Sequence, residues 1–281
     1  MGDIRLSYIV PAHNSAEVIE DTLHELAVQF EGGRFAGRQA EILVVENGST
    51  DSTPGLLRDA EAIWTRHDVT LRVLATDRGL GNALRHGIAE SRGDRIFLGA
   101  DDLPFGFGDL EAALPMDHPV VIGSKGHPDS RVHRSPTRSL LTNGFRVLRR
   151  MILGMRTRDP QGTFVLDGTW ARSVVARLRE PGYLFTTELC HLAESSGIMP
   201  VEVPVRLRAS HGSHTSRVTV RDVWRMGSGL LTVRRRHRGG RVEVSASSHA
   251  GALGSDACGQ ALSGKPRSSE AASSGWRSPG S

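Results

Sequence analysis

The amino-terminal part of the chain repeats a short apolar segment, a polar loop and a helical pattern, and few folds accommodate such a repeat. The apolar segments cover residues 6–10, 41–45, 71–75 and 95–98, and the stretches between them place apolar residues at helical spacing. Strands that alternate with crossover helices form a mostly parallel sheet. We therefore predict an α/β fold in which the loops after the strands share one sheet edge, where open α/β sheets bind ligands.

Local signals predict the helix boundaries and the buried faces. Pro11 should end the first strand, and Asn14 with Glu17 forms a capping box for the helix that follows. Thr53, directly before Pro54, is typical of the start of the second helix. The spacing predicts these buried residues: Ile19, Leu23, Leu26, Ala27 and Phe30 in the first helix, Leu56, Leu57, Ala60, Ile63 and Trp64 in the second, and Leu80, Ala83, Leu84, Gly87 and Ile88 in the third.

The segment 95–98 leads into two adjacent carboxylates, Asp101 and Asp102. Pro104 has no amide to donate to a central strand, so the acids should lie at the carboxyl edge of the sheet. There the repulsion between them favours a divalent cation, basic side chains or a shared proton. The alternative is an ordinary turn, with Asp102 as a turn residue before Pro104.

Composition and charge argue against several classes of protein. The chain has 281 residues, a net charge of +4 and no basic stripe interleaved with aromatic residues, which argues against nucleic acid as a partner. Cys190 and Cys258 lie far apart, which favours a reducing, cytoplasmic setting over a disulfide framework or a zinc site. The sequence has no charged-then-apolar leader and no run of about 18 apolar residues, so we expect any membrane contact to be peripheral, at the inner face.

The glycines of the loops do not match known phosphate-binding fingerprints. Gly79 and Gly81 lack the third glycine of a dinucleotide site, and the sequence contains no P-loop. This argues against a Rossmann oxidoreductase. A nucleotidyltransferase would need a glycine-rich loop with an arginine and a lysine near the first strand, which Pro11-Ala-His-Asn does not supply.

Short motifs at the predicted loops form an ordered series over residues 5–215. They are Val10-Pro-Ala-His-Asn, Val44-Val-Glu-Asn-Gly-Ser-Thr-Asp, Arg78-Gly-Leu-Gly-Asn-Ala, Asp101-Asp102, Val121-Ile-Gly-Ser-Lys, Arg158-Asp-Pro-Gln-Gly-Thr-Phe and Phe185-Thr-Thr-Glu-Leu. In order and spacing they resemble the inverting glycosyltransferases of family 2, and within them the dolichyl-phosphate mannose or glucose synthases. The resemblance implies a single catalytic GT-A domain, Rossmann-like, with a nucleotide-diphosphate sugar as donor and Mg²⁺ or Mn²⁺ as the metal.

The resemblance also implies roles for the donor-side loops. In the family a first loop and an Asp-Asp-Gly-Ser loop hold the base and ribose, and Glu46-Asn47 here replaces the two aspartates. The family's Asp-x-Asp pattern is altered too, with Ala100 at the first acid, Asp101 between and Asp102 at the last. We expect Asp102 as metal ligand and catalytic residue, and Asp101 as a second ligand or a contact to sugar or ribose. The implied nucleotide-sugar contacts are Pro11, Ala12, Asn14, Glu46, Gly48, Arg78, Asp101, Lys125, Arg206 and His214.

The second half of the chain supplies candidate groups for the leaving diphosphate and the acceptor. Positioned cations stabilise the negative charge that develops on a departing diphosphate. His214 stands where the family's mobile loop has a lysine, so it would bind diphosphate more weakly and in a pH-dependent way. The residues expected on the acceptor side are Arg134, Arg158, Asp159 and Gln161.

Glu188 has two candidate roles. Transfer to a hydroxyl needs a base that takes the proton, and Glu188 is the candidate for it. A phosphate acceptor is already anionic, and in that case Glu188 would position the acceptor or an arginine. The alternative is an ordinary acid near a helix N-terminus.

The predicted organisation has three parts. Residues 1–215 form the glycosyltransferase domain, 216–240 an amphipathic helix with a basic end, and 241–281 a disordered tail rich in serine and glycine. The helix should pack on the domain or lie on an anionic bilayer. We predict an inverting hexosyltransferase acting on a polyprenyl phosphate. The alternatives are a soluble enzyme with a small-molecule hydroxyl acceptor, such as a secondary metabolite or a nucleoside antibiotic core, and a non-catalytic sugar-nucleotide binding protein.

Overall fold

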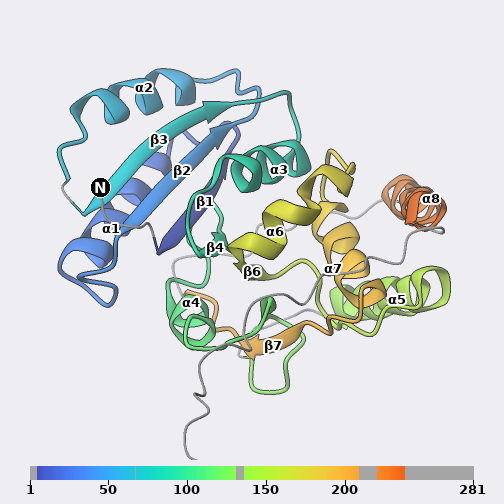
Figure 1. The fold of residues 1–281 in the computed structure, drawn as a ribbon. Helices are drawn as coiled ribbons and strands as arrows, with labels where there is room; N and C mark the ends of the chain where they lie inside the picture. The colour runs from blue at the N-terminus through green and yellow to red at the C-terminus, as the bar shows by residue number, and fades with distance from the viewer. Residues whose placement is uncertain (1–4, 67, 131–135, 209–219, 238–281) are drawn as a thin grey trace, which may run out of the picture. The chain divides into compact units, whose positions relative to one another are not determined.

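The computed structural model describes residues 5–66, 68–130, 136–208 and 220–237. Its strands form one sheet in the order β3-β2-β1-β4-β6-β5-β7 (Figure 1). The strands are β1 (Leu6–Ala12), β2 (Ala40–Glu46), β3 (Val69–Ala75), β4 (Arg95–Leu98), β5 (Val120–Ser124), β6 (Thr163–Asp167) and β7 (Val201–Pro204). The alternation of strands and helices predicted from the sequence is confirmed.

The sheet is mostly parallel, as predicted, and β6 is the exception. β1 pairs in parallel with β2 and β4, β2 with β3, and β5 with β7. β6 runs antiparallel to both of its neighbours, β4 and β5. β6 was not predicted from the sequence, because its first residues, Thr163 and Phe164, belong to the motif expected on the acceptor side. The cavity edge therefore meets the start of β6 rather than its end.

Helices cover both faces of the sheet because neighbouring strand residues point in opposite directions. Ile9 belongs to the core cluster that includes residues of α3, α6, α7 and α8, whereas Tyr8 and Val10 belong to the cluster that includes residues of α1, α2 and α4. The helices are α1 (Ile19–Glu31), α2 (Thr53–Ile63), α3 (Leu80–Glu90), α4 (Gly108–Ala113), α5 (Pro136–Leu153), α6 (Gly168–Val174), α7 (Phe185–Ser195) and α8 (Val220–His237).

Three local predictions were wrong. β1 continues through Pro11, because the missing amide of Pro11 faces the β4 side of the strand, beyond Leu98 where β4 has ended. Asn14 does not cap α1, which begins at Ile19. It has a φ of 53° and contacts Thr50 in the loop after β2 instead. Ile63, the last residue of α2, is 75% exposed. The buried face predicted for α1 is confirmed.

The carboxyl-terminal helix lies within the stretch predicted for it. α8 ends in Arg234, Arg235, Arg236 and His237, and its Leu230 and Val233 are buried in the core. Among the described residues, no helix is long and apolar enough to cross a membrane. The predicted tail at 241–281 lies outside the described residues.

Candidate functional site

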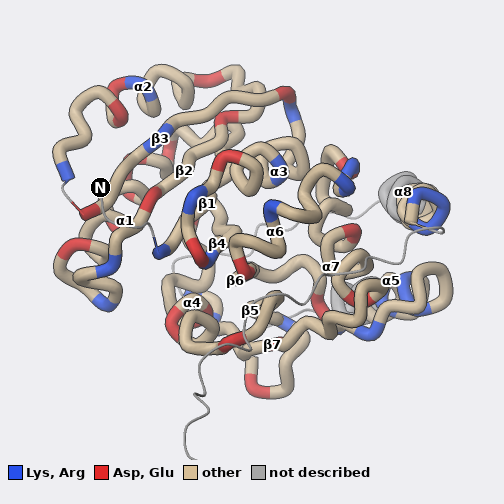
Figure 2. The backbone as a smooth tube through the Cα atoms, in the orientation of Figure 1, with Lys and Arg blue, Asp and Glu red and all other residues tan. Residues whose placement is uncertain are grey.

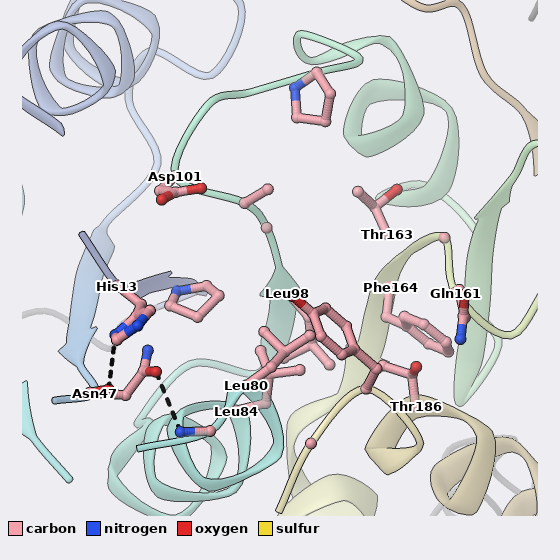
Figure 3. Close-up of a pocket in the computed structure, with 18 of the residues that line it drawn as sticks. His13, Asn47, Leu80, Leu84, Leu98, Asp101, Gln161, Thr163, Phe164 and Thr186 are labelled. Carbon is pink, nitrogen blue, oxygen red and sulfur yellow. Dashed lines mark hydrogen bonds between the residues drawn. The ribbon is translucent and has the colours of Figure 1, made fainter. Parts of the chain in front are cut away.

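A cavity of about 620 Å³ opens where the loops after β1, β2, β3 and β4 meet the start of β6 (Figure 3). Five of the residues predicted for the site line it: Pro11, Arg78, Asp101, Lys125 and Gln161. The same wall includes residues that were not predicted, among them His13, Asn47, Thr163, Tyr183 and Thr186. All of these except Tyr183 stand inside the quoted motifs, so the motifs were the signal for them.

The two acids after β4 are placed differently. Asp101 lines the cavity and accepts a hydrogen bond from Ser15 Oγ, while its backbone carbonyl accepts one from Thr22 Oγ1 at 2.6 Å. Burial raises the pKa of Asp101, the hydrogen bond from Ser15 opposes this, and the charge of Asp102 adds to the rise. Asp102 is partly buried and is not part of the cavity wall.

The loop after β1 contributes Pro11 and His13 to the cavity. His13 Nδ1 lies 3.1 Å from the carbonyl oxygen of Asn47, which can accept a hydrogen bond from the ring when Nδ1 carries a proton. Ala12 is fully buried. Asn14 is exposed and faces the neighbouring loop, where its Oδ1 accepts a hydrogen bond from the backbone amide of Thr50 at 2.8 Å.

In the loop after β2, Asn47 rather than Glu46 reaches the cavity. Asn47 Nδ2 donates to the carbonyl of Ala12 at 2.9 Å, and its Oδ1 accepts from the amide of Gly79 at 3.3 Å. Glu46 instead accepts a 2.5 Å hydrogen bond from the amide of Ser49 within its own loop. Asn47 therefore joins the loops after β1, β2 and β3.

The loop after β3 approaches its neighbours too closely for side chains. Gly48 has a φ of 76°, and a Cβ there would lie 3.2 Å from the Cβ of Arg78. Gly79 has a φ of 138°, and a Cβ there would lie 2.2 Å from the carbonyl oxygen of Pro181. This packing brings Arg78 to the cavity wall beside the loop that precedes α7.

Asp159 does not line the cavity, but it holds the backbone of the wall that faces the loops after β1, β2 and β3. Its Oδ2 accepts a hydrogen bond from the amide of Lys125 at 2.8 Å, and its Oδ1 accepts one from the amide of Gln161 at 3.2 Å. Lys125 Nζ lies 5.3 Å from the ring centroid of Phe105, which also lines the cavity. Arg158 is exposed and does not line the cavity.

The remaining predicted residues lie away from the cavity or outside the described chain. Arg206 is exposed, and Arg134 and His214 lie outside the described residues. Glu188 is 0% exposed on α7 and is not part of the cavity wall. Its carboxylate accepts hydrogen bonds from two backbone amides and two side chains of α8.

The side chains of the cavity wall can hold a metal cation only if a bound molecule such as a diphosphate supplies further oxygen atoms. Within the described ranges, no group of three His, Cys, Asp or Glu side chains could enclose a metal ion. Asp101 is the only carboxylate among the described residues of the cavity wall. Mg²⁺ is commonly held by one or two carboxylates and completed by phosphate oxygens and water, so one carboxylate fits a cation that arrives with a diphosphate.

A protein-family model described as "Glycosyl transferase family 2" matches residues 7–176. The chain is 31% identical over 225 residues to a dolichyl-phosphate beta-glucosyltransferase of Drosophila melanogaster, covering 75% of this chain and 69% of that protein. It is 28% identical to the human protein of the same name over 247 residues, covering 83% of this chain and 76% of that protein.

Among solved structures, glucosyl-3-phosphoglycerate synthase from Mycobacterium tuberculosis, in complex with Mn²⁺, UDP and glucosyl-3-phosphoglycerate, is similar with a TM-score of 0.55. The two chains are 19% identical, and the match covers 83% of this chain and 79% of the other. At this identity the similarity shows the fold alone. Together with the family match, it confirms the GT-A fold predicted from the motifs.

Proposed function

The chain belongs to glycosyl transferase family 2, and we propose that it transfers a hexosyl group, with inversion, from a nucleotide-diphosphate sugar to a polyprenyl phosphate. The curated relatives named dolichyl-phosphate beta-glucosyltransferase support this acceptor class. They do not favour the small-molecule hydroxyl acceptor.

The observation that carries the choice of acceptor is the composition of the cavity wall. Asp101 is the only carboxylate among the described residues that line it, and its hydrogen bond with Ser15 and its raised pKa suit a cation site. A hydroxyl acceptor needs a base near the attacking oxygen, whereas a phosphate oxygen is already anionic. A cavity whose described wall has one acid, which we assign to the donor, therefore fits a phosphate acceptor.

On the donor side, we assign the nucleotide to the loops after β1 and β2. His13 presents a ring whose orientation is fixed by the carbonyl of Asn47, and Pro11 and Asn47 form the adjoining wall. These groups can pack against a base and offer backbone polar atoms to its edge. We assign no direct contact to Glu46, Asn14 or Ala12, whose side chains are engaged or buried elsewhere.

Asp101 is the residue that we assign to a divalent cation bound jointly with the diphosphate. Such a cation, when present, would neutralise charge on the departing diphosphate. Ser15 fixes the orientation of the Asp101 carboxylate through its hydrogen bond. Asp102, expected from the sequence as the principal ligand, is assigned a supporting electrostatic role, because its charge contributes to the raised pKa of Asp101.

The basic side chains of the cavity wall are assigned to the donor diphosphate and to the acceptor phosphate. Arg78 comes from the donor side, after β3, and Lys125 comes from the opposite side, after β5. We assign Arg78 to the diphosphate, and Lys125 with Gln161 to the acceptor phosphate. Asp159 holds the backbone of both Lys125 and Gln161, so it orders the acceptor wall without entering the cavity.

A lipid acceptor also requires access to a bilayer, and α5 and α8 supply a surface for peripheral contact. The two helices pack against each other, and Figure 2 shows arginines or lysines along both. Exposed apolar side chains lie among these charges, including Val147 and Met151 on α5 and Leu231 on α8. Apolar side chains beside basic ones favour binding to the surface of an anionic bilayer.

The function is tested by incubating the purified protein with labelled UDP-, GDP- and dTDP-sugars, with and without Mn²⁺, and with a polyprenyl phosphate or the matching polyprenol. We expect labelled lipid from one donor with the phosphate and none with the free alcohol. Transfer to the alcohol alone would favour a hydroxyl acceptor. Nucleotide binding without product from any acceptor would indicate a non-catalytic binding protein.

A further inference from the structure

Glu188 is a buried carboxylate whose hydrogen-bonding capacity is fully used. Its Oε2 accepts from the backbone amides of Arg179 and Glu180 at 2.7 and 2.8 Å. Its Oε1 accepts from Arg236 Nη1 and His237 Nε2, both at 2.9 Å. A carboxylate has about four lone-pair sites, so these donors leave none to take a proton from a substrate.

One oxygen of Glu188 fixes a segment that belongs to the cavity wall. The segment continues through Pro181, whose carbonyl accepts from the amides of Gly81 and Asn82 at 2.9 and 3.2 Å, in the first turn of α3. A Cβ at Gly81 would lie 2.1 Å from the carbonyl oxygen of Glu180, so the segment and α3 are in direct backbone contact. The residues that follow, Gly182, Tyr183 and Thr186, line the cavity.

The other oxygen of Glu188 fixes the end of α8. Arg236 also pairs with Glu180 at 3.1 Å, so a single guanidinium joins both acids. The side chain of His237 is only 4% exposed, and its ring lies 6.0 Å from that of His191 on α7. Farther along α8, a Cβ at Gly229 would lie 2.3 Å from Leu184, which packs against the core beside the wall segment.

We propose that Glu188 is a positioning residue, which couples the last turn of α8 to residues 179–183, the segment whose Gly182 and Tyr183 line the cavity. α8 lines no part of the cavity among its described residues, yet through Glu188 its docking determines where Tyr183 and the first turn of α3 lie. The effect on catalysis rests on the proposed glycosyl transfer. The structural coupling does not.

The structural part is tested by hydrogen exchange of the full chain, followed by mass spectrometry. In Arg236→Ala, we expect the amides of residues 179, 180, 182, 183, 81 and 82 to exchange at least about tenfold faster than in the wild type, because their opening becomes easier. The charge-matched control is Arg5→Ala, since Arg5 lies in an exposed ion pair with Asp94. Equal exchange in the two variants would overturn the proposal, whatever the enzyme transfers.

The catalytic part is tested with kcat and KM of Glu188→Gln, Arg236→Ala and the double variant, with melting temperatures to confirm folding. A displaced wall should lower kcat/KM in both single variants by about tenfold to a hundredfold, and the double variant should be little worse than either. Arg236→Lys should restore part of the activity.

A large loss in Glu188→Gln together with normal activity in Arg236→Ala would indicate a base and overturn the proposal. If the wild type transfers no sugar, the proposed function fails, and hydrogen exchange still decides the coupling.

Discussion

Ser15 donates a hydrogen bond to the carboxylate of Asp101, although the two residues lie 86 positions apart in the sequence. The contact joins the loop after β1 to the loop after β4, across the central pair of strands. It fixes the one carboxylate that the described cavity wall contains, so a cation bound to Asp101 as proposed would take its geometry from both loops.

Asp101 and Asp102 should respond differently to removal of their charge. We expect Asp101→Asn to lose the Mn²⁺-dependent part of nucleotide affinity and to lower kcat/KM by about a hundredfold or more, a loss typical of groups that stabilise charge in the transition state. Asp102→Asn, the matched control, should lose much less because its side chain does not line the cavity. Calorimetric titration with UDP or GDP, with and without Mn²⁺, measures the difference; equal losses would contradict the placement.

The raised pKa of Asp101 predicts the pH dependence of cation binding. A cation binds the ionised carboxylate, so its affinity should fall as the pH drops through the pKa, and this fall should begin at a higher pH than for an exposed aspartate. Ser15→Ala removes a hydrogen bond that lowers the pKa, and should therefore move the fall to still higher pH. Titrations of Mn²⁺ affinity between mildly acidic and neutral pH would detect the shift, and identical curves would contradict it.

Asn47→Asp restores the acid that the family has at this position, yet we expect it to destabilise this protein. The side chain is 3% exposed and its Nδ2 donates to the carbonyl of Ala12. An aspartate would place an acceptor against that carbonyl, which should cost about 1–3 kcal/mol of unfolding free energy. Urea unfolding measures the change, and a stabilised variant would show that the amide is not required.

Gly81→Ala should disturb the wall segment because a Cβ there would meet backbone atoms of residues 180 and 181 at 2.1 and 2.8 Å. We expect lower thermal stability and lower activity. Gly55→Ala is the matched control, since a Cβ at Gly55 in α2 meets nothing within 4 Å. That change should stabilise the protein by about 0.5–1 kcal/mol through helix propensity. Differential scanning calorimetry of both variants tests the contrast.

Glu188 should make stability depend on pH. Burial acts to raise its pKa, but hydrogen bonds from His237, the amide of Glu180, Arg236 and the amide of Arg179 outweigh burial, and the pKa is lowered. Its contribution is therefore present above the pKa of an unfolded glutamate and is lost as the pH falls through the lowered value.

Glu188→Gln should accordingly lose most stability near neutral pH and little in strong acid. Nearby groups also titrate: burial and then the charge of Glu188 raise the pKa of Glu180, and burial lowers that of His191. Chemical unfolding at several pH values, with the difference between wild type and variant as the readout, measures the contribution of Glu188 together with its coupling to Glu180. A difference that does not change with pH would contradict this account.

The sequence predicted which loops meet but not which side chains they present. The strand–loop order brought Pro11, Arg78, Asp101, Lys125 and Gln161 to one cavity, because the ends of parallel strands share an edge. Asp101 and Asp102 lie in a turn that is separated from the end of β4 by two residues, so the choice between them depended on the conformation of that turn, which the sequence does not show.

Spacing in the sequence could not predict hydrogen bonds between residues that are far apart in the chain. Glu188 was a candidate base because nothing in its motif shows that amides at 179–180 and side chains at 236–237 converge on it. The same holds for Asn47, whose partners are two other loops. β6 was not predicted because its first residues, Thr163 and Phe164, belong to the motif that was interpreted as acceptor-side.

The reversed direction of β6 has an evolutionary consequence. Donor-side groups leave the sheet after β1, β2, β3 and β4, whereas Gln161 and Gly162 enter it just before β6. Insertions in the connection between α5 and β6 would thus change the acceptor side of the cavity wall, while the donor-side loops keep their conformation. Proteins with this architecture can therefore change their acceptor specificity while the loops assigned to the nucleotide stay the same.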